Sequence, residues 1–253
     1  MKKLVLSGFA FAFLSSGALA SPFAYATNYV QDLLQIDLNS PATVLIGNIG
    51  FAAQELAQTS SGQLFATNNT GKLFNVTGAI VTPVANLGSL SVGSMDSTGS
   101  TLWGYDNASQ RLFEYDPIAT SFVQWSPVLG LSNVNALCID SNGEFLFVDA
   151  VGSVDKFGKI TNGTWGVSLI NPNMGLQDHC EAMDFLADGN LYAVVLQDYR
   201  YQINPLTGAA ISGFNSGTHR DWADMTGPTS VPEPSSLMVL GMGLWLVRRR
   251  KTA

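Results

Sequence analysis

One stretch of the chain carries most of the information about its fold. It reads Asn142-Gly143-Glu144-Phe145-Leu146-Phe147-Val148, and Ser153-Val154-Asp155-Lys156-Phe157 follows after a short gap. An Asn-Gly pair is a strong turn signal, and the apolar run after it is typical of a buried strand. The second segment alternates between apolar and polar residues, which indicates a strand with one buried face and one wet face. The stretch therefore predicts a turn and two consecutive strands.

The same arrangement recurs along the chain. The glycine turn and its strand return at 61–67, 98–104 and 188–194, and the second strand returns at 72–76, 111–115 and 200–204. Residues 23–37 contain an incomplete copy that lacks the glycine turn. Turn signals and a third strand follow each complete copy, as at 80–81 and 122–125. The chain is thus a series of similar β-units.

The spacing of these units indicates the architecture. We take as equivalent points Ile36, Val76, Tyr115, Phe157 and Ile203, which are 40, 39, 42 and 46 residues apart. A period near forty with about four strands per unit is the signature of a β-propeller. An open solenoid is disfavoured because its repeats are usually shorter.

The two ends of the repeat region predict how the ring closes. A further strand precedes the glycine turn at 55–58, 135–138 and 181–184, and we call it the inner strand. The N-terminal unit lacks one. One further strand of this kind, 221–225, follows the last unit. Joining both termini in one blade removes the exposed strand edges. We therefore predict an all-β fold: a single five-bladed β-propeller over residues 21–226, closed by pairing of the N- and C-terminal strands.

The N-terminus has the features of a secretory signal peptide. Lys2 and Lys3 precede an apolar run from Leu4 to Leu14, and Ala18-Leu19-Ala20 forms a small-residue cleavage site. Cleavage after Ala26 would cut a predicted strand, so we place the signal peptide at residues 1–20. The apolar run is shorter than the ~20 residues of a membrane span, which disfavours an uncleaved anchor.

The C-terminus has three parts in a fixed order. A linker at 227–236 contains Val231-Pro232-Glu233-Pro234, and an apolar segment with a basic end, Arg248 to Lys251, occupies 237–251. This order resembles the PEP-CTERM sorting tail of exported proteins of Gram-negative bacteria. The resemblance covers only the tail. It implies an exosortase-like processing protease, delivery to the cell surface or the extracellular matrix, and exopolysaccharide as a partner.

The apolar segment of the tail is short. Leu237 to Val247 spans 11 residues, or ~16 Å as a short helix against a hydrocarbon core of ~30 Å. We therefore expect transient inner-membrane association before processing rather than a permanent transmembrane helix.

Charge excludes one class of function. Six basic and 18 acidic residues lie between Ser21 and Ser230, which gives this body a net charge of −12. Such a surface repels phosphate backbones, so no nucleic-acid partner is expected. Colloidal solubility, cationic partners and divalent cations remain open explanations.

The two histidines mark a candidate site. His179-x-Glu181-x-x-Asp184 and His219-x-Asp221-x-x-Asp224 share the pattern His-x-acid-x-x-Asp. Residues that enter the inner strands of a propeller face the mouth of its channel. The predicted ligand-binding set is therefore Gln54, Asn135, His179, Glu181, His219 and Asp221. Imidazole and carboxylate groups around one axis can hold a divalent cation such as calcium or a small polar ligand. Alternatively, each histidine only hydrogen-bonds the backbone of a neighbouring blade.

The sequence leaves two functions open. The first is a non-enzymatic binding or structural module; it needs only the sorting tail, a closed ring and the absence of nucleophile-elbow, phosphate-loop and zinc-protease motifs. The second is a hydrolase or lyase acting on extracellular carbohydrate or lactone, with Glu181, Asp184 and Asp221 as acid, base or ion ligands.

Two smaller features are also interpreted from the sequence. Cys138 and Cys180 are the only cysteines, and both a disulfide and two buried thiols are compatible with export. Segments 106–107 and 140–143 are interpreted as turns rather than calcium loops, because the acidic residue that ends such a loop is missing.

Overall fold

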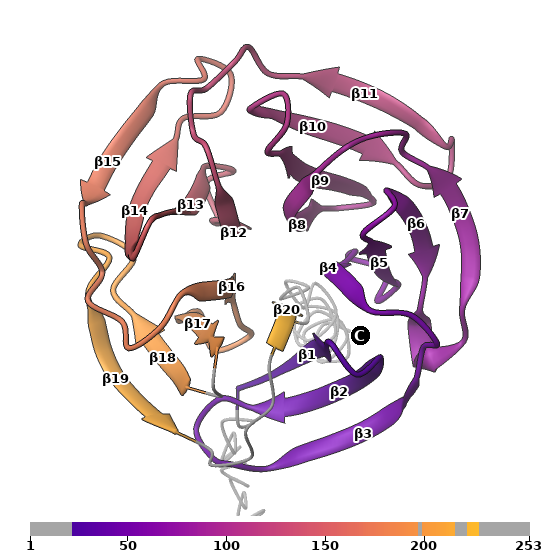
Figure 1. Cartoon of the computed structure of the whole chain (residues 1–253), viewed down its shortest axis with the longest axis horizontal. Helices are drawn as coiled ribbons and strands as arrows, with labels where there is room; N and C mark the ends of the chain where they lie inside the picture. Colours follow the sequence, from indigo (N-terminus) through magenta and orange to yellow (C-terminus); the bar gives the residue numbers. More distant parts are fainter. Residues whose placement is uncertain (1–21, 197–198, 216–221, 228–253) are drawn as a thin grey trace, which may run out of the picture.

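The computed structural model describes residues 22–196, 199–215 and 222–227, which form five four-stranded antiparallel sheets around a central axis (Figure 1). We name these sheets blades A to E in the order of the ring. Blade A consists of β20 (Trp222–Thr226), β1 (Phe23–Asn28), β2 (Asp32–Asp37) and β3 (Thr43–Asn48). Blade B consists of β4 (Ala53–Gln58), β5 (Leu64–Asn68), β6 (Lys72–Asn75) and β7 (Thr82–Asn86), with the 3-10 turn η1 (Thr77–Ala79) between its last two strands.

The other three blades follow the same plan, from the inner strand to the outer one. Blade C consists of β8 (Val92–Thr98), β9 (Thr101–Asp106), β10 (Arg111–Asp116) and β11 (Ser121–Trp125). Blade D consists of β12 (Val134–Ile139), β13 (Phe145–Val151), β14 (Val154–Ile160) and β15 (Val167–Asn171). Blade E consists of β16 (Cys180–Phe185), β17 (Leu191–Val195), β18 (Tyr199–Ile203) and β19 (Ala210–Asn215).

Blade A closes the ring and confirms the predicted five-bladed propeller. Its inner strand, β20, comes from the C-terminal end of the ring, and its other three strands come from the N-terminal end. The register places Thr226 opposite Tyr25 and Asp224 opposite Thr27. Backbone hydrogen bonds between the two ends of the chain therefore hold the ring shut.

The strand register corrects one landmark of the repeat. Ile36, Tyr115 and Ile203 pair with the first or second residue of the preceding strand, at Ala24, Leu102 and Leu191. In blade D the residue at this place is Ile160, which pairs with Phe145, whereas Phe157 pairs with Val148. Phe157 was therefore the wrong landmark. Both side chains are fully buried, so apolar alternation alone does not distinguish them.

Hydrophobic side chains fill the spaces between neighbouring blades. The inner strands contribute one large apolar residue each at the same place: Leu56, Met95, Leu137, Met183 and Met225, all of them buried. Burial of these layers is the main favourable term for closing the ring.

Several predicted segments lie outside the described residues: the signal peptide at 1–20, most of the 227–236 linker and the apolar helix at 237–247. Within the described part of the chain, no helix has the length and apolar character needed to cross a membrane.

Candidate functional site

Three of the predicted site residues occupy equivalent places in the ring. Gln54, Asn135 and Glu181 are each skipped in the pairing of their inner strand, so each lies in a β-bulge near the start of that strand. All three are half-buried. Bulges redirect a side chain out of the regular strand pattern. The corresponding bulge residues of blades C and A are Gly93 and Ala223.

His179 contacts a side chain of the neighbouring blade. Its Nδ1 lies 2.9 Å from Oδ1 of Asp155, and Oδ2 of Asp155 accepts a hydrogen bond of 2.7 Å from the Cys180 backbone N–H. The hydrogen bond with Asp155 raises the pKa of His179, although burial opposes it. Because Asp155 belongs to blade D and His179 precedes blade E, this pair joins two blades. The imidazole borders a small hollow of about 190 Å³.

His219 and Asp221 lie outside the described residues, so their place at the channel mouth remains a prediction. Among the residues that the structure does describe, no three His, Cys, Asp or Glu side chains are grouped so that they could hold a metal ion.

The registers also separate two aspartates that the sequence pattern had equated. Asp184 pairs with Tyr192, whereas Asp224 pairs with Thr27. In blade A the place of Asp184 is taken by Thr226, which pairs with Tyr25. Asp224 therefore sits two residues earlier in its strand than Asp184 does. Both strands are buried at almost every position, so burial patterns fit either alignment.

A first pair of buried carboxyl groups joins blades A and B. Oδ2 of Asp224 accepts a hydrogen bond from the Leu56 backbone N–H, and its Oδ1 accepts one of 2.7 Å from Met225. Burial and the neighbouring Asp224 carboxylate raise the pKa of Glu55 well above its usual range, and the hydrogen bond between the two groups raises it further.

A second pair lies near the other end of the inner strands. Oδ2 of Asp96 accepts a hydrogen bond of 2.7 Å from Ile139 in blade D, and its Oδ1 accepts one of 2.6 Å from Ser97. Oδ2 of Asp184 accepts hydrogen bonds from Gly227 and from the Thr226 hydroxyl in blade A, while its Oδ1 accepts one from Phe185. Burial raises the pKa of Asp184 to about 7. Burial and the Asp184 charge also raise the pKa of Asp96.

Asp96, Asp184 and Thr226 together accept hydrogen bonds from the equivalent backbone N–H group of each of the five inner strands. Asp96 and Asp184 each bond this group in their own strand, at Ser97 and Phe185, and in the next blade, at Ile139 and Gly227. In blade B the same group, at Gln58, donates to the Thr226 hydroxyl. Blades B and D have a small side chain, Ala57 or Cys138, in place of the aspartate. These two blades need no carboxylate at this place, because the next blade in the ring supplies an acceptor for its own backbone N–H group.

Cys138 and Cys180 are unbridged and fully buried thiols in the apolar cluster between blades D and E. Burial raises the pKa of both. Cys138 lies near the end of β12 and Cys180 at the start of β16, so the two thiols sit at opposite ends of neighbouring inner strands. Of the two alternatives left open by the sequence, the structure has the buried thiols.

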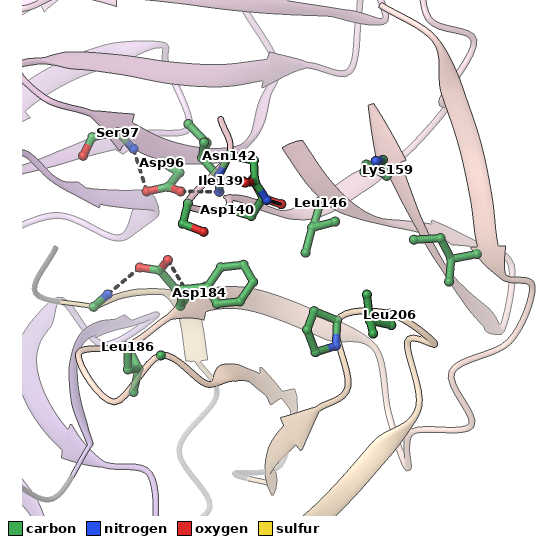
Figure 2. Close-up of a pocket in the computed structure, with 16 residues that line it drawn as sticks. Asp96, Ser97, Ile139, Asp140, Asn142, Leu146, Lys159, Asp184, Leu186 and Leu206 are labelled. Atoms are coloured by element: carbon green, nitrogen blue, oxygen red, sulfur yellow. Dashed lines mark hydrogen bonds between the residues drawn. The ribbon is translucent and has the colours of Figure 1, made fainter. Parts of the chain in front are cut away.

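A cavity of about 650 Å³ opens between blades D and E, and we call it the D–E pocket. Figure 2 shows Asp96 and Asp184 at one end and Leu146, Lys159 and Leu206 towards the other. The turn that begins at Asp140 forms part of its rim; Oδ1 of Asp140 accepts hydrogen bonds from the backbone of Asn142 and Glu144. The carboxylate thus shapes a turn, as the sequence suggested.

Comparisons with known proteins identify the tail and the fold. Residues 230–251 match the PEP-CTERM protein-sorting motif. This motif indicates an exported protein that is sorted to the cell envelope or surface. No curated protein matches the chain.

Among solved structures, a chain in the crystal structure of a nidogen/laminin complex superposes with a TM-score of 0.58 at 11% identity, covering 81% of this chain and 97% of that one. Kuenenia stuttgartiensis hydrazine synthase matches with a TM-score of 0.45 at 15% identity, covering 64% of this chain and 48% of that one. The first likeness shows the fold alone, and the second supports no argument.

Sequence reasoning missed Asp96 and Asp155. A signal for Asp96 exists, because Ser94-Met95-Asp96 has the same small-Met-Asp pattern as Ala182-Met183-Asp184. No comparable signal marks Asp155, whose role depends on how blades D and E meet.

Proposed function

We propose that this protein is an exported, non-enzymatic binding module of the cell envelope, and that the D–E pocket holds its ligand. One observation carries the proposal. Both oxygens of each carboxylate at the inner end of the pocket, Asp96 and Asp184, already accept hydrogen bonds from backbone N–H groups. A general acid or base must instead reach a proton of the substrate. These carboxylates hold the ring together, and the rest of the pocket is left to bind.

The lining of the D–E pocket favours a neutral or cationic ligand that is rich in hydroxyl groups. Asp96, Asp140 and Asp184 line it together with one basic residue, Lys159, so the lining offers no excess of positive charge to an anionic ligand. Leu146 and Leu206 add apolar surface. A saccharide combines hydroxyl groups with apolar ring faces, and the volume of the pocket is in the usual range for small-ligand sites. Exopolysaccharide, the partner implied by the sorting tail, belongs to this class.

The path of the chain supports display of this pocket. Gly227 lines the pocket and is the last described residue of the ring. The sorting motif begins at residue 230, three residues further along the sequence. We expect an exosortase-like protease and a transient inner-membrane association to act on this tail.

A glycan and metal-ion binding screen on the full chain tests the proposal. Ser141→Trp places an indole at the rim of the D–E pocket, and Ser60→Trp makes the same change in the equivalent turn of blade B. We expect Ser141→Trp to weaken binding of the best saccharide at least about tenfold, or ~1.4 kcal/mol, and Ser60→Trp to leave it unchanged. Equal binding by both variants, or no saccharide binding at all, would contradict the proposal.

A second function rests on one observation. A pKa of about 7 at Asp184 suits a general acid, as a carbohydrate- or lactone-directed hydrolase or lyase requires. Such an enzyme would release product from a bound saccharide or lactone. Asp184→Asn should abolish this release while binding persists. Binding without turnover would leave the first function.

A further inference from the structure

In each blade, the turn between the third and fourth strands meets the preceding blade of the ring. At three of the five junctions this turn is anchored. In blade A, the carbonyl oxygens of Asp37 and Ser40 accept hydrogen bonds from Arg200 of blade E, and in blade B the turn η1 contacts strand β3 of blade A. In blade D, the centroid of the Trp165 ring lies 6.2 Å from that of Trp103 in blade C. These three turns therefore pack onto the preceding blade or bond to it.

The turns of blades C and E have a different construction. Each contains a proline followed by an aliphatic residue, Pro117-Ile118 in blade C and Pro205-Leu206 in blade E. Oδ1 of Asp116 accepts a hydrogen bond of 2.8 Å from the Ile118 N–H, and Oδ1 of Asn204 accepts one of 2.9 Å from the Leu206 N–H. Ile118 is 77% exposed and Leu206 is 84% exposed. Both turns therefore hold an aliphatic side chain in solvent instead of packing it on the preceding blade.

A hollow opens at each of these two junctions. The first is the D–E pocket, which the turn of blade E borders. The second, of about 380 Å³, lies between blades B and C and is bordered by the turn of blade C; we call it the B–C groove. Equivalent pairs of residues line the two sites, because Phe65 pairs with Asn75 in blade B as Leu146 pairs with Lys159 in blade D. The B–C groove is thus the counterpart of the D–E pocket, two blades away.

The lining of the B–C groove carries no charge. None of its nine residues is acidic or basic. Lys159 and Glu144, which form an ion pair of 3.9 Å in blade D, are replaced in blade B by Asn75 and Gln63. An ionic ligand therefore finds no counter-charge in this groove.

What the B–C groove offers instead is a mixture of neutral polar groups and apolar surface. Gln63 and Asn75 contribute side-chain amides, and Thr82 contributes a hydroxyl group. Ile80 and Ile118 contribute apolar side chains that are 73% and 77% exposed. A neutral sugar ring has hydroxyl groups that can bond amides and hydroxyls, and C–H faces that can cover aliphatic side chains. The groove therefore suits a neutral saccharide better than an ion or a peptide with charged groups.

We propose that the B–C groove is a second saccharide site, and that the propeller holds two segments of a neutral polysaccharide, one in this groove and one in the D–E pocket. The class of ligand rests on the proposed function of the D–E pocket. Gln63 and Ile118 place the B–C groove at the β4–β5 and β10–β11 connections, and Ser141 and Leu206 place the D–E pocket at the β12–β13 and β18–β19 connections. Both sites therefore open at the same end of the blades. Two sites on one face raise the affinity for a polymer above that for a short fragment.

Equilibrium dialysis of the full chain against labelled neutral tetrasaccharides of glucose, galactose and mannose tests this proposal. We expect the best of them to bind at two sites per chain. Gln63→Trp, which places an indole in the B–C groove, should leave one site, and so should Ser141→Trp in the D–E pocket. The double variant should bind none. Ser60→Trp is the matched control, because Ser60 is exposed in the same turn as Gln63 but does not line the groove; both sites and the melting temperature should be unchanged.

The two proposals fail in different ways. One site per chain, lost in Ser141→Trp and kept in Gln63→Trp, would overturn the second site and leave the function of the D–E pocket intact. One site lost only in Gln63→Trp would support the B–C groove and contradict the D–E pocket. No binding of any tetrasaccharide would contradict both.

A polymer provides a further readout. The polysaccharide built from the best sugar should bind at least about tenfold more tightly than its tetrasaccharide, and either Gln63→Trp or Ser141→Trp should remove this gain. An equal gain in Gln63→Trp would place the second contact elsewhere and would also overturn the proposal.

Discussion

Blade E packs against each of its neighbours through an apolar cluster, but its polar contacts with the two differ. Towards blade A, Asp184 accepts hydrogen bonds from Thr226 and Gly227, and the buried Arg200 reaches across the junction. Towards blade D, Asp155 accepts a hydrogen bond at the start of β16, and the D–E pocket opens near the other end of this strand. We call the contact between blades E and A the closing junction; hydrogen bonds join the blades at the end of the inner strands where the contact with blade D leaves room for a ligand.

Arg200 is a fully buried side chain that joins blade E to blade A. Its guanidinium donates to the carbonyl oxygens of Asp37 and Ser40 in blade A, and it lies 5.5 Å from the Trp222 ring. We expect Arg200→Met to cost about 3–5 kcal/mol of unfolding free energy, because buried acceptors lose their donor. Arg111→Met, at a half-buried arginine of blade C, should cost less than about 1 kcal/mol. Urea denaturation measures both, and equal losses would show that the closing junction is not special.

The next prediction concerns Cys138, which occupies the aspartate place in blade D. By the repeat pattern, Cys138→Asp restores the aspartate found in blades C and E. We nevertheless expect a loss of about 3 kcal/mol or more, because the Phe185 N–H that it would need already donates to Asp184. The new carboxyl would be buried beside Asp96 and Asp184 without a donor. Cys138→Ser, measured in the same way, controls for loss of the thiol. A stable Cys138→Asp protein would contradict the claim that no backbone N–H group is left to bond a carboxyl group at this place.

Removing the acceptor itself should have a smaller effect. Asp184→Ala leaves the N–H groups of Phe185 and Gly227 without an acceptor, and we expect a loss of about 2 kcal/mol. Part of the cost is offset because a buried carboxyl is also removed. Cys138→Ala, at the equivalent place, should cost about 1 kcal/mol or less. Thermal denaturation compares them, and the comparison between junctions fails if the order is reversed.

The comparison also shows where sequence reasoning stops. The forty-residue period and the unmatched strand at 221–225 were sufficient to predict five blades and their closure. The period does not fix register, because Phe157 and Ile160, like Asp184 and Asp224, are buried in either alignment. The residues at the inner end of the D–E pocket depend on which blade supplies the acceptor for each inner-strand N–H group. Ala57 and Cys138 give no local sign that the following blade compensates for them.

A further expected effect, for Asp184 alone about as large as that of Asp184→Ala, is a pH dependence of the closing junction. Burial raises the pKa of Asp184 from an ordinary value near 4 to about 7. Between these values the folded protein binds a proton that the unfolded chain has released, so stability must fall as pH rises. The contribution is complete below about pH 4 and is lost as pH rises through about 7.

For Asp184 alone we expect a loss of about 2 kcal/mol between pH 5 and pH 7.5. The raised pKa values of Glu55, Asp96 and Asp224 act in the same direction. Urea denaturation across this range measures the slope, and Asp184→Ala should flatten it while leaving the contribution of the other three. A slope of the opposite sign would mean that Asp184 is ionised in the folded ring at all these pH values. The closing junction would then contain a buried carboxylate charge rather than a protonated Asp184.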